Sequence, residues 1–221
     1  SFSKQPQEAI CQTMRQVLDV EPGNQMALSE LLQYYAERND GKGVEDISRR
    51  GLNYHPEEIS YAYYLGLALA EQRKLTQATE VMQQGLRVRT EDVHPHLVSN
   101  VFATLGDIYY QQGKEQEAYA AYDSALVYKD DNIPCLNNYA YYLSLRDEEL
   151  QKALAMAQLA ITLEEDNYNY IDTYAWVLHR LGRNDEAKRY MRQALSLCSQ
   201  RDANLLMHYA DIFWALGEEF M

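Results

Sequence analysis

The chain has 221 residues, enough for one large domain or one repeat array. Its 47% hydrophobic content excludes a disordered chain, and its 5 Pro and 10 Gly are too few for an all-β protein built on tight turns. A formal net charge of −13 makes nucleic acid and anionic lipid unfavourable partners, because both repel an acidic surface.

The charge is unevenly distributed. The segment 179–201 carries six bases and two acids, a net charge of +4, which leaves −17 for the rest of the chain. We interpret the segment as a solvated helix face. The alternative is a basic groove for nucleic acid, whose binding would weaken steeply with salt.

The first predicted helix covers residues 8–20 and ends before the turn residues Pro22 and Gly23. From there on, two kinds of helix alternate. One kind carries a large apolar residue, then Gly or Ala, then another apolar residue three positions later: Leu65, Gly66 and Leu69; Leu105, Gly106 and Tyr109; Tyr174, Ala175 and Leu178. The other kind carries a small residue about a dozen positions after the Gly or Ala of the preceding helix, and another near its own end: Ala78 and Gly85; Ala118 and Ala125; Ala187 and Ala194.

The position of the first small residue in this second kind of helix recurs with a regular period. It falls at Ile10, Val44, Ala78, Ala118, Ala153 and Ala187, in steps of 34, 34, 40, 35 and 34 residues. The long step contains residues 89–95, which predict an enlarged linker or an extra turn on the flanking helices. The turn at residues 146–149 holds one extra residue, and Gly113 and Gly182 stand where a first helix should stop.

This large–small pattern with a 34-residue period resembles the tetratricopeptide repeat. Small residues let two antiparallel helices approach closely, and large ones fill the space beside them. The resemblance implies an all-α, right-handed superhelical solenoid of antiparallel helix pairs. We expect one domain over residues 1–221, with about five full repeats and a half repeat at each end.

The two ends of the chain look like halves of hairpins. Residues 8–20 match a second helix without its first, and residues 205–217 match a first helix without its second. Apolar residues such as Trp214 and Phe220 make a poor cap for a solenoid. We expect a piece of a longer array; the alternative is that the half hairpins are themselves the caps.

The runs 136–143 and 170–178 look most like bacterial tetratricopeptide proteins. Some of those are cell-envelope lipoproteins, so the resemblance alone favours the cell envelope as location. No lipid-attachment Cys is visible in the sequence. The three cysteines show no paired spacing, and we interpret them as core residues or half-buried thiols.

In this family the first helices line the concave face, which is where we expect a ligand. The predicted ligand-binding residues are Asn137, Tyr141, Asp172, Trp176, His179, Arg180, Asp107 and Tyr110. Aromatic residues and Arg often dominate interfaces, and Asn can bond both the N–H and the C=O of a peptide. For Trp176 and Trp214 the alternative is packing between repeats.

The expected partner is a protein or peptide that is neutral or basic rather than acidic. Family members that hold an acidic C-terminus use Lys and Arg on successive first helices. None of the matching positions here is basic: Ser29, Tyr63, Ala103, Asn137, Asp172 and Met207. The alternative function is an assembly or regulatory domain that contacts a neighbouring domain or a second copy, through self-association of exposed terminal helices.

The sequence does not indicate an enzyme, a cofactor or a metal. It contains none of the common nucleotide-binding, zinc-protease or nucleophile-elbow motifs. His94 and His96 lie in the long linker without a set of further ligands. Asp172, His179 and Arg180 share a predicted helix, but an Asp–His pair without a nucleophile is more often structural. We also expect no direct membrane insertion.

Overall fold

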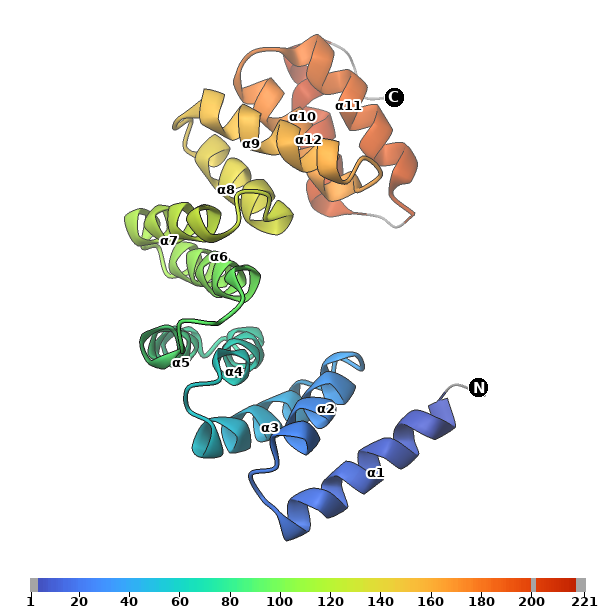
Figure 1. The fold of residues 1–221 in the computed structure, drawn as a ribbon. Coiled ribbons are helices and arrows are strands. Elements are labelled where there is room, and N and C mark those ends of the chain that lie inside the picture. Colours follow the sequence, from blue (N-terminus) through green and yellow to red (C-terminus); the bar gives the residue numbers. More distant parts are fainter. Residues whose placement is uncertain (1–3, 200–201, 218–221) are drawn as a thin grey trace. The chain divides into compact units, whose positions relative to one another are not determined.

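A computed structural model describes residues 4–199 and 202–217, with side chains from residue 8 onward. Arg201 and Phe220, which contributed to the predictions above, lie outside the described residues. The described helices (Figure 1) are α1 (Lys4–Val20), α2 (Gln25–Ala36), α3 (Gly41–Tyr54), α4 (Ile59–Glu71), α5 (Leu75–Val88), α6 (Pro95–Gln111), α7 (Glu115–Tyr128), α8 (Ile133–Leu145), α9 (Leu150–Leu163), α10 (Tyr168–Arg180), α11 (Asn184–Leu197) and α12 (Ala203–Ala215).

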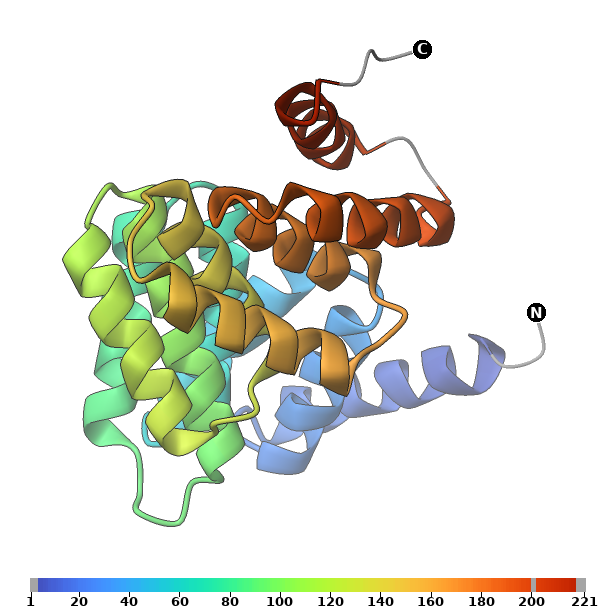
Figure 2. The same cartoon turned by 90° about the horizontal axis from the view of Figure 1, so that it is seen from above.

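The alternation of two kinds of helix is confirmed. The second helices α3, α5, α7, α9 and α11 all have 14 residues, and the first helices α4, α8, α10 and α12 all have 13. No strand occurs within the described ranges, so the all-α helical repeat is established there. Within each part of the chain, successive helices contact one another, from α1 to α6 in the first part and from α8 to α12 in the second (Figures 1 and 2).

The long step of 40 residues has two causes. The linker at residues 89–94 is two residues longer than the four-residue links at 55–58, 129–132 and 164–167, and α6 has 17 residues in place of 13. Both predicted alternatives therefore occur together. The extra residue in the turn at 146–149 is also present, where Asp147 and Glu149 adopt positive φ angles of 55° and 41°.

Polar side chains begin several first helices, as the turn residues in the sequence predict. Asn24 accepts a hydrogen bond from the backbone N–H of Ala27 at 3.0 Å, and Asn132 accepts one from Cys135 at 3.2 Å. Asp202 likewise bonds the first turn of α12. Such caps satisfy backbone donors that have no partner inside the helix, so they fix where each first helix starts.

Glycines end the first helices where the sequence predicted. Gly113 and Gly182 have φ angles of +74° and +75°, in the left-handed region, and an added Cβ at either would meet nothing within 4 Å. Gly182→Ala should therefore lower the free energy of unfolding by about 1 kcal/mol, through backbone strain alone. Chemical denaturation followed by circular dichroism measures this, and an unchanged midpoint would contradict it.

The chain divides into two compact units, residues 1–121 and residues 122–221, and each is described by itself. Such a division suits a repeat array, in which each repeat contacts only its neighbours. A single domain over residues 1–221 stays a prediction. Within the described residues, no helix is both long and apolar enough to span a bilayer. Cys11 and Cys135 are buried and Cys198 is half-buried, as predicted.

Candidate functional site

A cleft of 360 Å³ opens in the second unit, between α8, α10 and the start of α12. First helices supply its walls, as expected for the ligand face of such an array. Its lining residues are Pro134, Asn137, Asn138, Tyr141, Asn169, Tyr170, Asp172, Thr173, Asp202, Asn204 and His208. The cleft is therefore lined by amides, two carboxylates and aromatic rings, with no Lys or Arg among these residues.

Three of the predicted ligand-binding residues line this cleft, namely Asn137, Tyr141 and Asp172. Three more, Trp176, His179 and Arg180, lie further along α10 and are not part of its lining. The remaining two, Asp107 and Tyr110, belong to α6 in the first unit. Of the six predicted residues that belong to the second unit, three therefore line one cleft.

His208 of α12 is a cleft residue that the sequence analysis missed. Its Nδ1 lies 2.9 and 3.0 Å from the two carboxylate oxygens of Asp172, and its side chain is almost fully buried. The imidazole also stacks on Trp176, with ring centroids 4.2 Å apart and planes at 23°. The ring centroid of Tyr141, on α8, lies 5.9 Å from that of His208. His208 therefore fixes the Asp172 carboxylate and joins α12 to α10.

Trp176 takes the packing role that the sequence left open. It is only 7% exposed, whereas Trp214 on α12 is 84% exposed. Within the described ranges, the buried Nε1 of Trp176 has no hydrogen-bond partner. Its ring stacks on His208 and does not line the cleft, so any contribution of Trp176 to binding is through the position of that imidazole.

His179 and Arg180 are held by structural contacts at the end of α10. The Nδ1 of His179 lies 2.8 Å from the Oδ1 of Asn184, at the start of α11. The Arg180 guanidinium forms two hydrogen bonds to Asp147, in the turn with the extra residue. Asp172, His179 and Arg180 thus have three different partners and form no array resembling a hydrolytic site.

The amides of the cleft carry both hydrogen-bond donors and acceptors. The Nδ2 of Asn137 donates to the Oδ1 of Asn138 at 3.1 Å, and the buried Oδ1 of Asn137 has no hydrogen-bond partner among the described residues. Burial raises the pKa of Tyr170, with the Glu164 carboxylate adding to the effect, so this hydroxyl stays protonated at neutral pH. The wall of the cleft can therefore both donate and accept hydrogen bonds.

Comparison with known proteins agrees with the repeat pattern. A tetratricopeptide repeat family model matches residues 54–219. A TPR repeat-containing protein of Pseudomonas aeruginosa is 25% identical over 193 residues, which are 86% of this chain. These residues are 32% of that protein, so the chain spans about a third of the length of this curated relative.

Solved structures show the same fold. One chain of the APC/C hetero-tetramer Cut9–Hcn1 matches 96% of this chain over 40% of its own length, with a TM-score of 0.77 and 16% identity. Pseudomonas aeruginosa pilF matches 97% of this chain and 87% of its own, with a TM-score of 0.68 and 14% identity. YrrB, described as a TPR protein with an unusual peptide-binding site, matches 89% of this chain over 97% of its own length, with a TM-score of 0.62 and 12% identity. Since the family model covers most of the sequence, the chain belongs to the tetratricopeptide repeat family.

Proposed function

We propose that this chain is a protein-interaction scaffold that binds an extended peptide segment of a partner in the cleft between α8, α10 and α12. The family fold supports a role in binding proteins, and no residue grouping in the described part of the cleft resembles a catalytic array. A rigid wall built from three successive first helices holds its side chains in place before the ligand arrives, which lowers the entropic penalty of binding.

The observation that carries the proposal is the set of amides in the cleft. Asn137, Asn138, Asn169 and Asn204 come from three different helices and line one surface. An amide can bond the N–H and the C=O of a peptide at once, so such a surface suits an extended backbone.

The charge of the cleft sets the kind of peptide. Among the described residues that line the cleft, Asp172 and Asp202 are the two carboxylates, and none is Lys or Arg. An acidic ligand would meet like charge there, whereas a neutral or basic one would not. We therefore propose a neutral or basic segment, with an apolar or aromatic side chain that contacts Tyr141 or Tyr170.

Affinity capture with a matched pair of double variants tests this proposal. Asn137→Ala with Tyr141→Ala removes an amide and a ring from the cleft, and both side chains are only half-buried. Asn53→Ala with Tyr54→Ala makes the same chemical change at two exposed positions of α3. We expect the cleft variant to lose a partner, by at least about tenfold in recovered amount, that wild type and the α3 variant both retain.

Circular dichroism spectra of all three proteins control for folding. If the folded cleft variant recovers the same partners as the wild type, the cleft is not the binding site. Trp176→Ala is unsuited to this test, because removal of a buried ring is expected to destabilise the protein.

A specific observation favours one alternative, an assembly domain. The outer side of α12 is apolar: Leu206 is 42% exposed, Met207 58% and Trp214 84%. With the intervening Ala210 these residues form one stripe at helical spacing, opposite the buried Leu205 and Ile212. In this alternative, the stripe contacts another domain or a second copy, and the α8–α10–α12 cleft binds no free peptide.

A further inference from the structure

Asp172 lies on the middle helix of the three that form the cleft. α10 contacts both α8 and α12, and Asp172 lines the cleft together with Asn137 of α8 and Asn204 of α12. Its side chain is 14% exposed, so the carboxylate is largely withdrawn from solvent but still reaches the space of 360 Å³. This volume is at the lower end of the range for ligand pockets, which leaves room for one side chain and part of a peptide backbone.

The helices of the cleft supply this carboxylate with few cations. α8 and α12 contain no Lys or Arg, and the one such residue of α10, Arg180, is bonded to Asp147 in the turn before α9. Among the described residues, only His208 bonds Asp172. A cation that entered the cleft would therefore meet the carboxylate without competition from a Lys or Arg of these helices.

His208 holds the carboxylate with a single ring nitrogen. Its Nδ1 lies 2.9 Å and 3.0 Å from the two oxygens of Asp172, so one N–H is shared between them. A neutral imidazole with its hydrogen on Nδ1 makes this bond, and a carboxylate has about four acceptor positions in total. The contact therefore fixes the orientation of the carboxylate and leaves it further acceptor positions for a ligand.

The imidazole is in turn held by aromatic neighbours. His208 is 3% exposed, with the Trp176 ring stacked at 4.2 Å and the ring centroid of Tyr141 at 5.9 Å. Because such a closely packed side chain has little freedom to change rotamer, the Asp172 carboxylate is oriented before a ligand arrives. An oriented carboxylate loses less side-chain entropy on binding a cation than a mobile one does.

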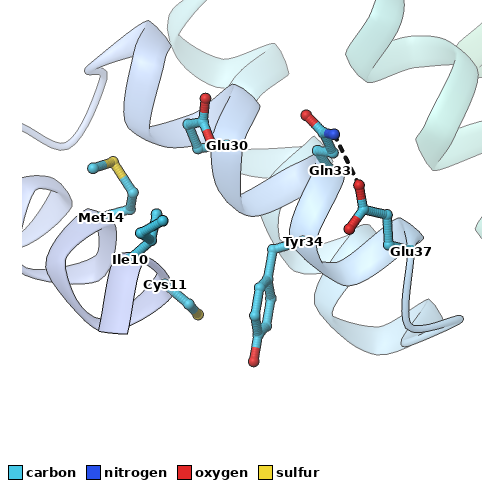
Figure 3. A pocket seen from close by; sticks show the side chains of 7 residues that line it. All are labelled: Ile10, Cys11, Met14, Glu30, Gln33, Tyr34 and Glu37. Carbon is cyan, nitrogen blue, oxygen red and sulfur yellow. Dashed lines mark hydrogen bonds between the residues drawn. The ribbon is translucent and has the colours of Figure 1, made fainter. Parts of the chain in front are cut away.

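The carboxylates of another hollow lack this support. A space of 180 Å³ lies between α1 and α2 in the first unit, and Glu30 and Glu37 are among the residues that line it (Figure 3). Glu37 is exposed and accepts a hydrogen bond at 2.8 Å from Gln33, one turn earlier on the same helix. Glu37 is therefore a matched control for Asp172, since it lines a hollow but is not oriented by a buried group of another helix.

We propose that Asp172 recognises a Lys or Arg side chain of the bound peptide, and that His208 is the positioning residue for its carboxylate. The inference rests on the proposed peptide cleft and narrows the ligand from a neutral or basic segment to one with a cation at a defined place. The ammonium or guanidinium of the ligand donates to the Asp172 oxygens, while its backbone contacts the amides of α8 and α12.

Two pools of synthetic peptides test this proposal on the full chain. Both contain peptides of about seven residues with blocked ends and mixed uncharged residues around a fixed central position. The central residue is Lys in one pool and norleucine, which lacks the ammonium, in the other, so Lys supplies the only cation. At about 0.15 M salt, the immobilised wild type should retain at least about tenfold more of the Lys pool, as expected for a hydrogen bond between charged groups in a largely buried place.

Single variants locate the recognition. Asp172→Asn should abolish the preference for Lys, whereas Glu37→Gln changes the net charge equally and should keep it. His208→Ala should reduce the preference severalfold, and His208→Asn should restore most of it, because the amide N–H can take the place of the Nδ1–H. Circular dichroism shows whether each variant is folded. If folded His208→Asn restores nothing, His208 is not the positioning residue.

The outcomes separate this inference from the proposed function. If Asn137→Ala with Tyr141→Ala lowers the retention of both pools but the wild type does not prefer Lys, the cleft binds peptides and Asp172 does not recognise a cation. If that double variant retains both pools as the wild type does, the peptide cleft and this inference fail together. A preference for Lys that persists in folded Asp172→Asn, or that Glu37→Gln loses to the same extent, also overturns the inference.

Discussion

Replacing Trp176 by alanine is expected to lower the free energy of unfolding by about 3–5 kcal/mol, the range for removal of a large buried aromatic side chain. Trp176 is 7% exposed and stacks on His208 at 4.2 Å, and the Arg180 guanidinium lies 5.6 Å from its ring. Its loss leaves a cavity between α10 and α12 and removes the support of the buried His208. The effect should therefore appear as early unfolding of the second unit.

Trp214→Ala is the matched control, because the same side chain is removed from a position that is 84% exposed. We expect its effect to stay within about 0.5 kcal/mol. Guanidinium denaturation followed by circular dichroism at 222 nm compares the two without relying on tryptophan fluorescence. Equal midpoints for both variants would show that Trp176 does not pack as described.

Gly85→Ala is expected to lower the free energy of unfolding by about 1–2 kcal/mol, although alanine favours helices. An added Cβ at Gly85 would lie 2.5 Å from the Cβ of Ala62, which is fully buried on α4. Ala62 has no further side-chain atoms that could move away, so α4 and α5 must separate. Overpacking of about 1–3 kcal/mol outweighs the helix preference of about 0.5–1 kcal/mol.

Gly41→Ala is the matched control, and it is not expected to lower the free energy of unfolding. Gly41 begins α3, and an added Cβ would meet only a Glu71 oxygen, at 3.6 Å. We expect a gain of up to about 1 kcal/mol or no change. The same denaturation experiment measures both variants. A Gly85→Ala protein as stable as Gly41→Ala would contradict the close approach of α4 and α5.

The fold follows from the sequence because the packing rule repeats. Gly66 lies against Met82 and Gly85 against Ala62, so each small residue in the pattern marks a contact between helices. Helix ends were equally visible, since Gly113 and Gly182 need the left-handed conformation that glycine adopts readily. The sequence did not show how the six extra residues of the long step divide between the linker and α6. Pro95 can begin a helix or follow a loop, so either division fitted the pattern.

The cleft was only partly predictable. Asn137, Tyr141 and Asp172 lie on predicted first helices at positions not needed for packing, and they line it. His208 was missed, although the signal existed: it lies 36 residues after Asp172, close to one repeat, and neighbouring first helices bring such positions together. An acid and a histidine at that spacing predict a bond between two first helices.

The two tryptophans show where sequence reasoning had no basis for a decision. Trp176 has α12 packed beside it, whereas Trp214 lies on the last described helix and is left 84% exposed by the described residues. Their burial depends on the neighbouring helix and not on the local pattern.

Site-specific photo-crosslinking tests the central claim most directly. A benzophenone amino acid replaces Asn204, an exposed cleft residue at the start of α12, or Asn53, an exposed residue of α3. After irradiation in a lysate of the source organism, the crosslinked peptides are identified by mass spectrometry. The proposal predicts one neutral or basic partner segment attached at position 204 and absent at position 53, with attachment abolished by Asn137→Ala and Tyr141→Ala. The same adducts at both positions, or adducts that persist in the folded cleft variant, would contradict it.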